Sequence, residues 1–434
     1  MGFVKSASIT FMGNLLSFVL TLLSAAIMAR LLGPAGRGIV EVATNFLSFA
    51  TLILGWGLAS ANVYVLGRKQ ESLAAVLGNN LLMMLPTALL LIPFYFLNQA
   101  YHFQFLRGVN QLQILIVLIT IPLFSFKAGV VNIFLGLQDI VEYNRLNVLD
   151  RSLSLVLLTV FLLLVPTPTT ALVATFMGVL MLSLWEIYLI SQRRGIKPVL
   201  DRAVLRGLLS YGVQAQVGNT IQKLNYRLDV FIVNYYLPLS QVGIYGAAVV
   251  LAETLWGVSS SIATVIFPLA AASGGDKDMH AFTNQVTRMS VSLIAFFSLG
   301  LAVISKPLIT LMYGSAFAAT VPALLLLLPG ITIFSVSNIL ANYLAGVGLA
   351  TRNTYSAMIS SGVTIALDLL LIPRMGINGA SIATTFSYVT FTTTTLIFYI
   401  RFTHARWQDV LVFKRGDYLL LKEAFRRKLA RSGT

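Results

Sequence analysis

Long apolar runs separated by short polar stretches are the dominant pattern of this chain. Each run is close to the roughly 20 residues that an α-helix needs to cross a membrane. The runs do not alternate between apolar and polar residues, as the strands of a membrane β-barrel do. We therefore expect twelve transmembrane helices, near residues 7–32, 38–65, 74–98, 112–136, 144–165, 169–190, 206–236, 240–270, 284–305, 318–346, 353–373 and 377–400.

The composition indicates an all-α polytopic membrane protein. Of the 434 residues, 57% are hydrophobic and only 10% are charged, whereas soluble domains carry roughly 25% charged residues. The mean hydropathy is +0.84. The chain has no Cys and three scattered His, so it offers neither a thiol nucleophile nor a metal-ligating pair. We expect no metal and no cofactor.

The basic residues set the expected orientation. The net charge is +15, but the basic residues are spread between the apolar runs rather than gathered in one soluble patch, so nucleic acid is not an expected partner. If both termini are cytoplasmic, most of the 30 Lys and Arg fall on the inner side, as the positive-inside rule requires. The outer segments then hold only Arg30, Arg37, Arg107, Lys306 and Arg374.

The chain is expected to divide into two six-helix lobes. Gly13-Asn14 recurs as Gly218-Asn219, and Gly38-Ile39 recurs as Gly243-Ile244, at one constant offset. This indicates a duplication, with chance recurrence in a Gly-rich apolar chain as the alternative. Since each half has an even number of spans, a pseudo-twofold axis along the membrane normal relates them across a central cleft. The expected parts are an N-terminal lobe (1–190), a cytoplasmic linker (191–205), a C-terminal lobe (206–400) and a basic amphipathic cytoplasmic tail (401–434).

The seventh predicted span carries polar residues where a bilayer tolerates few. At 100° per residue, five of its side chains fall within about 80° of one another on the helix surface. A charge near the bilayer centre costs at least about 2.5–3.5 kcal/mol, so this stripe should face a water-filled cavity or a partner helix. Its residues are Gln216, Asn219, Lys223, Arg227 and Asn234.

Two further cations extend this stripe. Lys127 lies within the fourth span and Arg30 ends the first, so Lys127, Lys223, Arg227 and Arg30 form a series staggered from the inner to the outer face. Ammonium and guanidinium groups bind phosphate through charge-assisted hydrogen bonds. We therefore expect these cations, with the polar residues of the stripe, to bind the phosphate or pyrophosphate of an anionic substrate. In the alternative, each cation is neutralised locally or anchors a helix end.

Acidic residues of the second half are candidate counter-ions or coupling residues. Glu253 of the eighth span can pair with Arg227 or Lys223, and Asp229 lies on the side of the seventh helix that faces its own bundle. A coupling ion, H⁺ or Na⁺, would bind such carboxylates. Asp368 lies near a predicted helix end, where we expect it to contact solvent.

Two prolines and the tail complete the predicted features. Pro122 and Pro329 interrupt the fourth and tenth spans, which are equivalent helices of the two halves, and we expect them to act as hinges or as static kinks. The tail mixes Lys and Arg with Trp407 and Phe413. This mixture is typical of a basic segment on an anionic membrane surface, and a simple topology anchor is the alternative.

Three stretches resemble a known group. ARLLGPAGRGIVEVA (29–43) resembles the segment joining the first two spans of the polysaccharide-type (oligosaccharide/O-antigen) flippases in the multidrug/oligosaccharidyl-lipid/polysaccharide exporter superfamily. SYGVQAQVGNTIQKLNYRLDVFIVNYYL (210–237) and VGIYGAAVVLAETLW (242–256) resemble that family's seventh and eighth spans.

This resemblance implies that the chain moves polyprenyl-pyrophosphate-linked oligosaccharide from the inner to the outer leaflet of the bacterial cytoplasmic membrane. The transport would serve surface or exopolysaccharide biosynthesis and would proceed by alternating access. Membrane lipids and other polysaccharide-assembly proteins would be its partners. Cationic residues in the cleft would receive the pyrophosphate, and Lys223 and Arg227 have suitable places for that role. Lys127 matches no motif of the family.

Two other functions stay open. A cation-coupled multidrug antiporter of the same superfamily needs acidic groups in the cleft, and Glu253 and Asp229 are available, although the stripe is cationic. A membrane-embedded polysaccharide polymerase or ligase needs a sizeable outer loop that carries catalytic residues, whereas outer loops such as PTPTT (166–170) are minimal. We therefore expect a transporter rather than an enzyme.

Overall fold

The computed structural model describes residues 3–68, 72–193, 195–414 and 417, without the side chains of residues 3–11, 193, 217–219, 222, 224–226 and 258. Within these residues all regular structure is helical. The first half contains α1 (Phe3–Leu54), α2 (Leu58–Gly67), α3 (Leu73–Leu82), α4 (Met84–Tyr101), α5 (Gln111–Gly136), α6 (Ile140–Leu164) and α7 (Pro168–Arg193), with a short η1 (Gln104–Leu106). The second half contains α8 (Arg202–Tyr236), α9 (Leu239–Ser273), α10 (Lys277–Tyr313), α11 (Thr320–Gly346), α12 (Ala350–Met375), α13 (Ile377–Thr403) and α14 (Trp407–Leu411), with a short η2 (Ser315–Phe317).

Each of the twelve predicted spans falls on helix, but two breaks shape the first two. Gly33 has φ 67° and ψ −178° inside α1, a conformation that glycine adopts readily, and Pro34 begins the helix that follows. This break lies at the predicted boundary between the first two spans. The second span is interrupted again at Trp56 and Gly57, whose φ values are 54° and 67°, between α1 and α2. The second break is not evident from hydrophobicity, because the apolar pattern continues through it.

Nine helical segments of the described residues are long and apolar enough to cross a membrane, by length and composition. One of these segments, Met12–Leu54, contains both helices of α1, on either side of the break at Gly33. Two predicted spans, α8 and α13, fall outside this set: α8 carries the charges noted above, and α13 is rich in Thr. The protein is a multi-pass, all-α membrane protein.

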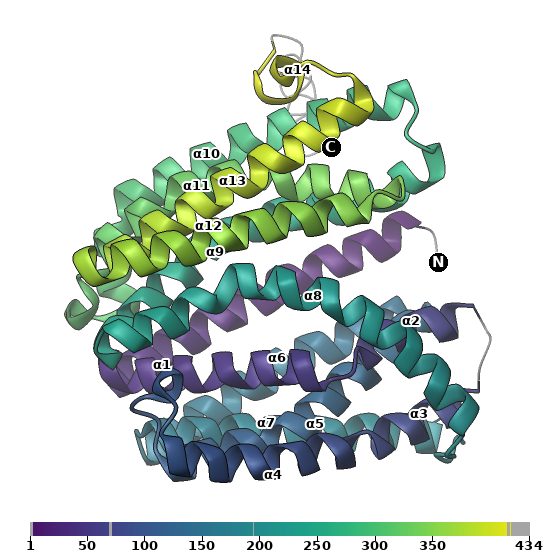
Figure 1. Cartoon of the computed structure of the whole chain (residues 1–434), viewed down its shortest axis with the longest axis vertical. Coiled ribbons are helices and arrows are strands. Elements are labelled where there is room, and N and C mark those ends of the chain that lie inside the picture. The colour runs from purple at the N-terminus through teal and green to yellow at the C-terminus, as the bar shows by residue number, and fades with distance from the viewer. Residues whose placement is uncertain (1–2, 69–71, 194, 415–416, 418–434) are drawn as a thin grey trace, which may run out of the picture.

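The helices form two groups that lie one above the other in Figure 1. In the upper group α11 packs against α9 and α13, and in the lower group α5 packs against α2, α4 and α7. Helix α8 belongs to both, since it packs against α12 of its own half and against α2 of the other. The predicted division into two lobes stays a proposal, and the helix packing is consistent with it.

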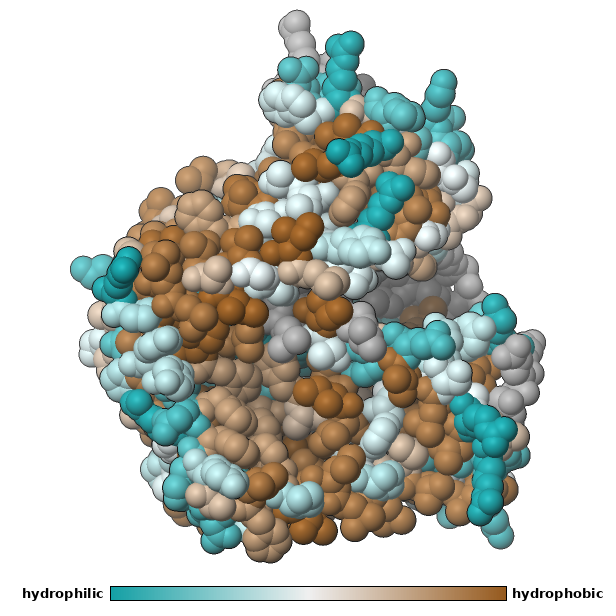
Figure 2. Space-filling model, viewed as in Figure 1, coloured by the Kyte–Doolittle hydropathy of each residue, from teal (hydrophilic) through white to brown (hydrophobic). Residues whose placement is uncertain are grey.

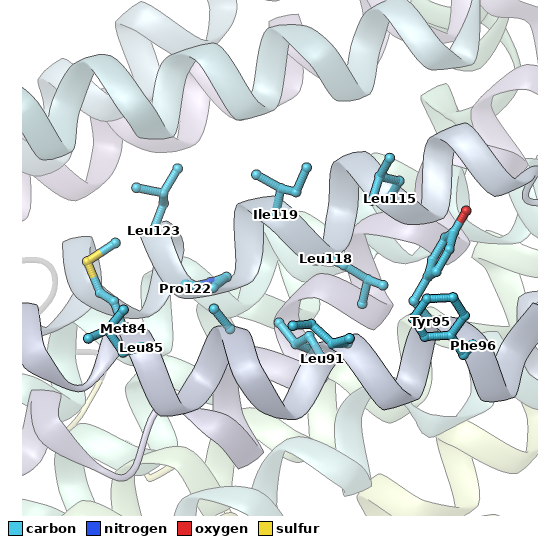
Figure 3. A pocket seen from close by; sticks show the side chains of 12 residues that line it. Met84, Leu85, Leu91, Tyr95, Phe96, Leu115, Leu118, Ile119, Pro122 and Leu123 are labelled. Atoms are coloured by element: carbon cyan, nitrogen blue, oxygen red, sulfur yellow. The ribbon is translucent and has the colours of Figure 1, made fainter.

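The outer surface of the helices is largely apolar. Figure 2 shows brown, hydrophobic residues over both groups, with teal residues concentrated toward the edges. Exposed side chains such as Leu89, Val303 and Leu311 have lipid rather than water as their expected surroundings. Helices α4 and α5 enclose a largely apolar groove of about 500 Å³ on the lower group, to which Pro122 and Phe96 contribute, and Tyr95 is its one polar side chain (Figure 3). No charged residue lines it, so the groove offers no site for an ion.

Helices α1 and α9 touch through their backbones at one point. A Cβ atom added to Gly38 would overlap the carbonyl oxygen of Leu239, and one added to Gly243 would overlap the carbonyl oxygen of Pro34. Small residues are typical of such close crossings between membrane helices. Gly38 and Gly243 are matched by the proposed duplication, and Pro34 and Leu239 are matched at the same offset, so the contact is symmetric between the two halves.

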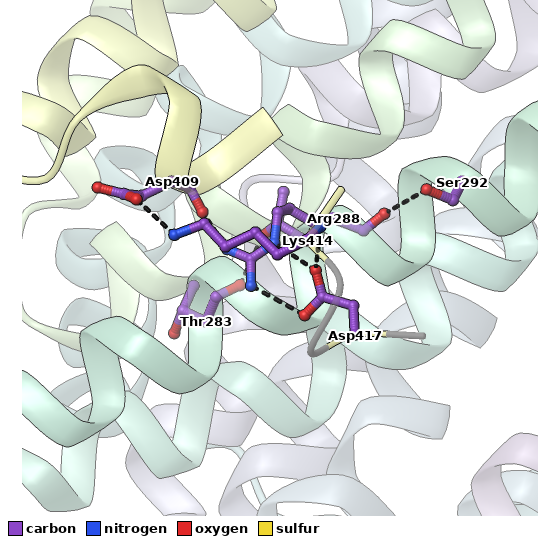
Figure 4. Close-up of polar contacts among 7 residues, drawn as sticks. Thr283, Arg288, Ser292, Asp409, Lys414 and Asp417 are labelled. Carbon is purple, nitrogen blue, oxygen red and sulfur yellow. Dashed lines mark hydrogen bonds and ion pairs between the residues drawn. The ribbon is translucent and has the colours of Figure 1, made fainter. Parts of the chain in front are cut away.

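The segment after α13 folds back onto α10. Arg288 donates two hydrogen bonds to Asp417, from Nε to Oδ2 at 2.8 Å and from Nη2 to Oδ1 at 2.9 Å (Figure 4). Arg288 also binds the carbonyl of Asp409, whose carboxylate pairs with Lys414 at 2.6 Å. The hydrogen bonds from Arg288 hold the pKa of Asp417 below its ordinary value. Residues 418–434 of the predicted amphipathic tail lie outside the described residues.

Candidate functional site

A polar cavity lies where α8 meets the first half of the chain. Its volume is about 480 Å³, and its walls come from the second helix of α1, from α2, α5, α6 and α7, and from α8. Most of the polar groups are hydroxyls, and no Asp or Glu is among the lining residues. The polar lining residues are Thr44, Ser48, Thr51, Ser60, Ser125, Arg151, Thr175, Gln216 and Lys223.

Helix α8 contributes Gln216 and Lys223 to this cavity. The amide of Gln216 donates a hydrogen bond to the carbonyl of Leu52, in the last turn of α1. The carbonyls of the last turn of a helix have no partner within that helix, so Gln216 satisfies a group that the break at Trp56 and Gly57 exposes. About two turns further along α8, Lys223 is half-buried in the cavity wall.

The second cation of the cavity is Arg151, on α6. Sequence reasoning assigned this residue to the inner loops as a topology charge and did not consider it as a site residue. Arg151 lies next to Asp150 within the fifth predicted span (144–165), and a charge inside an apolar span was the signal that could have marked it as a site residue. The charges of Arg151 and Lys223 act on each other, so the cavity is cationic.

Arg227 pairs with Glu253 rather than standing free. Its Nη2 atom lies 2.6 Å from Oε2 of Glu253 on α9, and the two side chains are 24% and 19% exposed. This is the local pairing that the sequence left as an alternative. Arg227 is not among the lining residues of the cavity, although it lies one turn beyond Lys223 on the same helix.

Asp229 is buried in the second half, on the opposite side of α8. It accepts hydrogen bonds from the hydroxyl of Tyr245 and from the backbone N–H of Val230, and Tyr245 in turn contacts Thr384 at 3.1 Å. Asp368 on α12 lies within electrostatic reach of Asp229. Asp368 was expected to contact solvent, and this expectation was wrong: the residue is 0% exposed, and neither carboxylate oxygen has a hydrogen-bond partner among the described residues.

Lys127 is paired within the first half. Its ammonium lies 2.8 Å from Oδ1 of Asp150 on α6 and 4.8 Å from the ring centroid of Phe124. Lys127 is buried and is not among the lining residues of the cavity. It therefore does not share one continuous surface with Lys223.

The remaining predicted cation and amide join the two halves at the predicted outer end. Arg30 donates hydrogen bonds to the carbonyls of Leu311 and Met312, at the end of α10. Asn234 donates to the carbonyls of Phe105 at 3.1 Å and Arg107 at 3.2 Å, in and after η1. Both therefore connect the two halves instead of lining the cavity.

A buried arginine that sequence reasoning did not single out strengthens the same end. Arg37 is 2% exposed, donates a hydrogen bond to the carbonyl of Ala25, and places its guanidinium 5.0 Å from the ring centroid of Tyr313. Together with Arg30, Asn234 and the Gly38–Gly243 contact, it closes the predicted outer end between the two halves. We call these contacts the outer seal.

The other predicted residues take less distinctive positions. The side chain of Asn219 lies outside the described residues. Pro122 and Pro329 lie inside α5 and α11, which both continue past them. Their predicted role as hinges therefore stays a prediction.

Comparison with known proteins identifies the family. Residues 27–322 match the family described as polysaccharide biosynthesis protein. The succinoglycan biosynthesis transport protein ExoT of Rhizobium meliloti is 26% identical over 355 residues, which cover 80% of this chain and 70% of ExoT.

Two archaeal relatives match a shorter part of the chain. The uncharacterized membrane protein MJ1068 of Methanocaldococcus jannaschii is 25% identical over 196 residues, 44% of this chain. The probable low-salt glycan biosynthesis flippase Agl15 of Haloferax volcanii is 28% identical over 198 residues, 42% of this chain. The match spans only 39% of the length of each of these two relatives.

Solved structures show the same fold. The lipid II flippase MurJ in an inward closed conformation superposes with a TM-score of 0.75 at 15% identity, over 98% of this chain and 100% of that one. An outward-facing multidrug resistance MATE family transporter of the MOP superfamily superposes with a TM-score of 0.66 at 15% identity, over 92% and 96%. These likenesses confirm the predicted fold class, and because the family match covers more than half of the chain, the protein belongs to the polysaccharide biosynthesis protein family.

Proposed function

We propose that the protein is a flippase that moves a lipid-linked glycan across the membrane, and that its cavity binds the phosphate or pyrophosphate of the lipid carrier. The observation that carries this proposal is that two cations, Lys223 and Arg151, line the same polar cavity, which has no carboxylate among its lining residues. Hydroxyl groups around the two cations suit the hydrogen-bonding needs of a sugar phosphate. The relatives Agl15, a probable low-salt glycan biosynthesis flippase, and ExoT, a succinoglycan biosynthesis transport protein, support the same substrate class.

The finer substrate follows from the chemistry of the cavity. Two cations match the charge of a diphosphate, so polyprenyl-pyrophosphate-linked oligosaccharide is the substrate we favour. Arg227 lies one turn beyond Lys223 and is paired with Glu253, so a substrate phosphate that binds Arg227 must compete with the Glu253 carboxylate. Arg30, Asn234 and Lys127, which we expected to bind substrate, are reassigned in this proposal to holding the protein's own structure.

Alternating access is the mechanism that we propose. The outer seal closes one end between the two lobes, and an outward-open state requires the seal to separate. The orientation with cytoplasmic termini follows from the distribution of basic residues and puts the seal at the outer face of the membrane. Pro122 and Pro329 are the candidate hinges. A coupling ion, H⁺ or Na⁺, is proposed to bind at Asp229 with Asp368, since both oxygens of Asp368 are buried without a hydrogen-bond partner.

The test of this function is transport of a lipid pyrophosphate. The protein is reconstituted in vesicles that contain a fluorescent polyprenyl pyrophosphate, and movement of the probe between leaflets is followed. Each charge-assisted contact is worth roughly 1.5–3 kcal/mol, so Lys223→Ala and Arg151→Ala should each weaken probe binding about 10-fold to 100-fold. The matched control removes two cations outside the cavity, Lys306 and Arg374, and should transport normally.

Loss of glycan export from a deletion strain, restored by the intact chain but not by the Lys223→Ala, Arg151→Ala double variant, would extend the result to the cell. Normal transport by the double variant would remove the proposed site. Transport of organic cations in place of the lipid probe would favour the antiporter, for which the Asp229–Asp368 pair is the supporting observation. New glycosidic bonds formed in the vesicles would favour the polymerase or ligase.

A further inference from the structure

A buried charged cluster lies in the first half, behind the cavity wall. Its members come from three helices: Lys127 on α5, Asp150 on α6 and Glu186 on α7. Lys127 and Asp150 form the ion pair of 2.8 Å described above. Glu186 is only 1% exposed, and the charges of Lys127 and Asp150 both act on it. One of its oxygens, Oε2, has no hydrogen-bond partner among the described residues.

The charges of this cluster do not balance when both carboxyl groups are ionised. One ammonium faces two carboxylates, and the ammonium is already bonded to Asp150. An unpaired charge in such a place is costly, because burial removes the water that would solvate it. A proton on Glu186 removes the excess negative charge and supplies an O–H group, so that the cluster becomes neutral.

The other charged groups near α7 are engaged elsewhere. On α6, Glu142 and Arg145 pair with each other, and Arg151 lines the cavity. On α1, which also packs against α7, Glu41 accepts a hydrogen bond from Asn45, and Arg30 and Arg37 are bound in the outer seal. Among these described groups, Lys127 and Asp150 are therefore the ones that decide the charge state of Glu186.

We propose that Glu186 is a proton-binding site whose occupancy changes the charge of the first half beside the cavity. The site is distinct from the acidic pair in the second half. A proton suits it better than Na⁺, because the neighbouring ammonium repels a metal cation but leaves a carboxyl oxygen free to be protonated. No group of three or more His, Cys, Asp or Glu residues suited to a metal occurs among the described residues.

The cluster has a route to water through Asp150. Its side chain is 25% exposed, against 8% for that of Lys127, and Arg151, the next residue, lines the cavity. A proton that arrives from outside the cluster reaches Asp150 first and Glu186 afterwards. The exposed member thus supplies access, and the buried member holds the proton.

Occupancy of this site should influence anion binding in the cavity. When Glu186 loses its proton, the cluster gains one negative charge, and because Asp150 of the cluster is followed directly by the cavity residue Arg151, an anionic ligand is bound less tightly. Linkage requires the reverse as well, so anion binding should promote proton uptake at Glu186. The linkage between proton binding and anion binding rests on the proposed function, whereas proton binding by Glu186 does not.

The proton site is tested first without any ligand. Infrared difference spectroscopy of the purified protein between two pH values detects the C=O stretch of carboxylic acids that gain or lose a proton. Glu186→Gln should remove one such band, and Glu142→Gln, which alters a carboxylate in the same half, should leave it unchanged. A spectrum of Glu186→Gln identical to that of the parent protein would overturn the proposal. So would a band that does not change with pH, or one that Na⁺ removes at constant pH while K⁺ does not.

The linkage is tested with inorganic pyrophosphate as the probe. Calorimetric titration in two buffers of different ionisation enthalpy gives the number of protons taken up on binding. The parent protein should take up a fraction of a proton, and Glu186→Gln should take up none through this site and should bind the probe with an affinity that varies less with pH. Equal proton uptake by both proteins would overturn the linkage. Failure of lipid transport with the infrared result intact would count against the proposed function and leave the proton site standing.

Discussion

The contact between Gly38 and Gly243 provides the sharpest test of the outer seal. The perturbation is Gly243→Ala, which adds a single methyl group. That Cβ atom would overlap the carbonyl oxygen of Pro34 and lie 2.9 Å from the backbone nitrogen of Gly38. Both obstacles are backbone atoms, so no side chain can rotate away and α1 and α9 must separate.

The size of the effect follows from the cost of overpacking. Added groups in a well-packed interior typically cost about 1–3 kcal/mol. The cost applies to the closed state alone, because the two helices no longer touch once the seal opens. Since about 1.4 kcal/mol changes an equilibrium tenfold, the open fraction should rise roughly 5-fold to 150-fold, for as long as the closed state remains dominant.

The assay uses the absence of cysteine from the chain. A single cysteine replaces Thr44, which lines the cavity, and its rate of reaction with a membrane-impermeant thiol reagent is measured in vesicles of both orientations. Gly257→Ala is the matched control: Gly257 lies on the same helix α9, and an added Cβ there meets no atom within 4 Å.

The expected result is faster labelling of Gly243→Ala from the outer side and parental labelling of Gly257→Ala. Equal rates for the two variants would refute the reasoning that the glycine contact holds the seal. A rate that rises only from the inner side would refute the assigned orientation of the seal.

Three further predictions concern charge pairs. Arg227→Gln leaves Glu253 without its partner and should lower the free energy of unfolding by about 1–3 kcal/mol, whereas the double variant with Glu253→Gln should recover most of this in a thermal-unfolding assay. Asp417→Asn removes the charge that Arg288 binds, so the fraction of molecules whose C-terminal segment is detached from α10 should rise about 10-fold to 100-fold. The rate of tryptic cleavage at Lys414, compared with that of the parent protein, measures this fraction. The pKa of Asp417 is lowered in the folded state, so the free energy of docking of the C-terminal segment should be complete above about pH 4 and should fall as the pH drops through that lowered pKa. Hydrogen exchange of the segment, measured against pH in the parent protein and in Asp417→Asn, tests this. Equal pH dependence of the two proteins would contradict it.

Much of the fold could be predicted from the sequence, because the length and hydrophobicity of an apolar run are enough to identify a membrane helix. The Gly33–Pro34 break falls at a predicted boundary, and the charges of α8 mark a helix that packs against both halves. The break at Trp56 and Gly57 was missed, since no polar residue interrupts the apolar pattern there. A change in backbone direction leaves little trace in hydrophobicity when both flanking helices are buried.

The site was predicted less completely, and the reason is geometric. A helical wheel gives the direction of a side chain but not the group that stands opposite it. Along α8 the same stripe meets the cavity at Gln216 and Lys223, a carboxylate at Arg227, and the carbonyls of η1 at Asn234. One face therefore has three surroundings, because a long helix passes several neighbours.

Buried acids were the other gap. Glu186 was not considered and Asp368 was assigned to solvent, although both lie within predicted spans. Sequence position alone does not distinguish a carboxylate at a helix end from one enclosed by three helices. A single Asp or Glu within an apolar run is nevertheless costly wherever it is buried, and this rule would have drawn attention to both residues.

The two halves share one contact while differing in their chemistry, and the difference has a physical reason. At the outer seal, Gly38 and Pro34 face Gly243 and Leu239 through equivalent contacts, because a crossing at the pseudo-twofold axis that we propose is satisfied by the same small residue on both sides. The cavity has no such requirement. The ligand that we propose is a lipid with one charged head, which Lys223 of the second half and Arg151 of the first half already match, so further cations at the positions equivalent to Lys223 and Arg227 would be buried without a counter-charge whenever the ligand is absent. The first half accordingly places Phe18 and Leu22 where the second has Lys223 and Arg227, and each cation of α8 can then be satisfied singly, by water in the cavity or by Glu253.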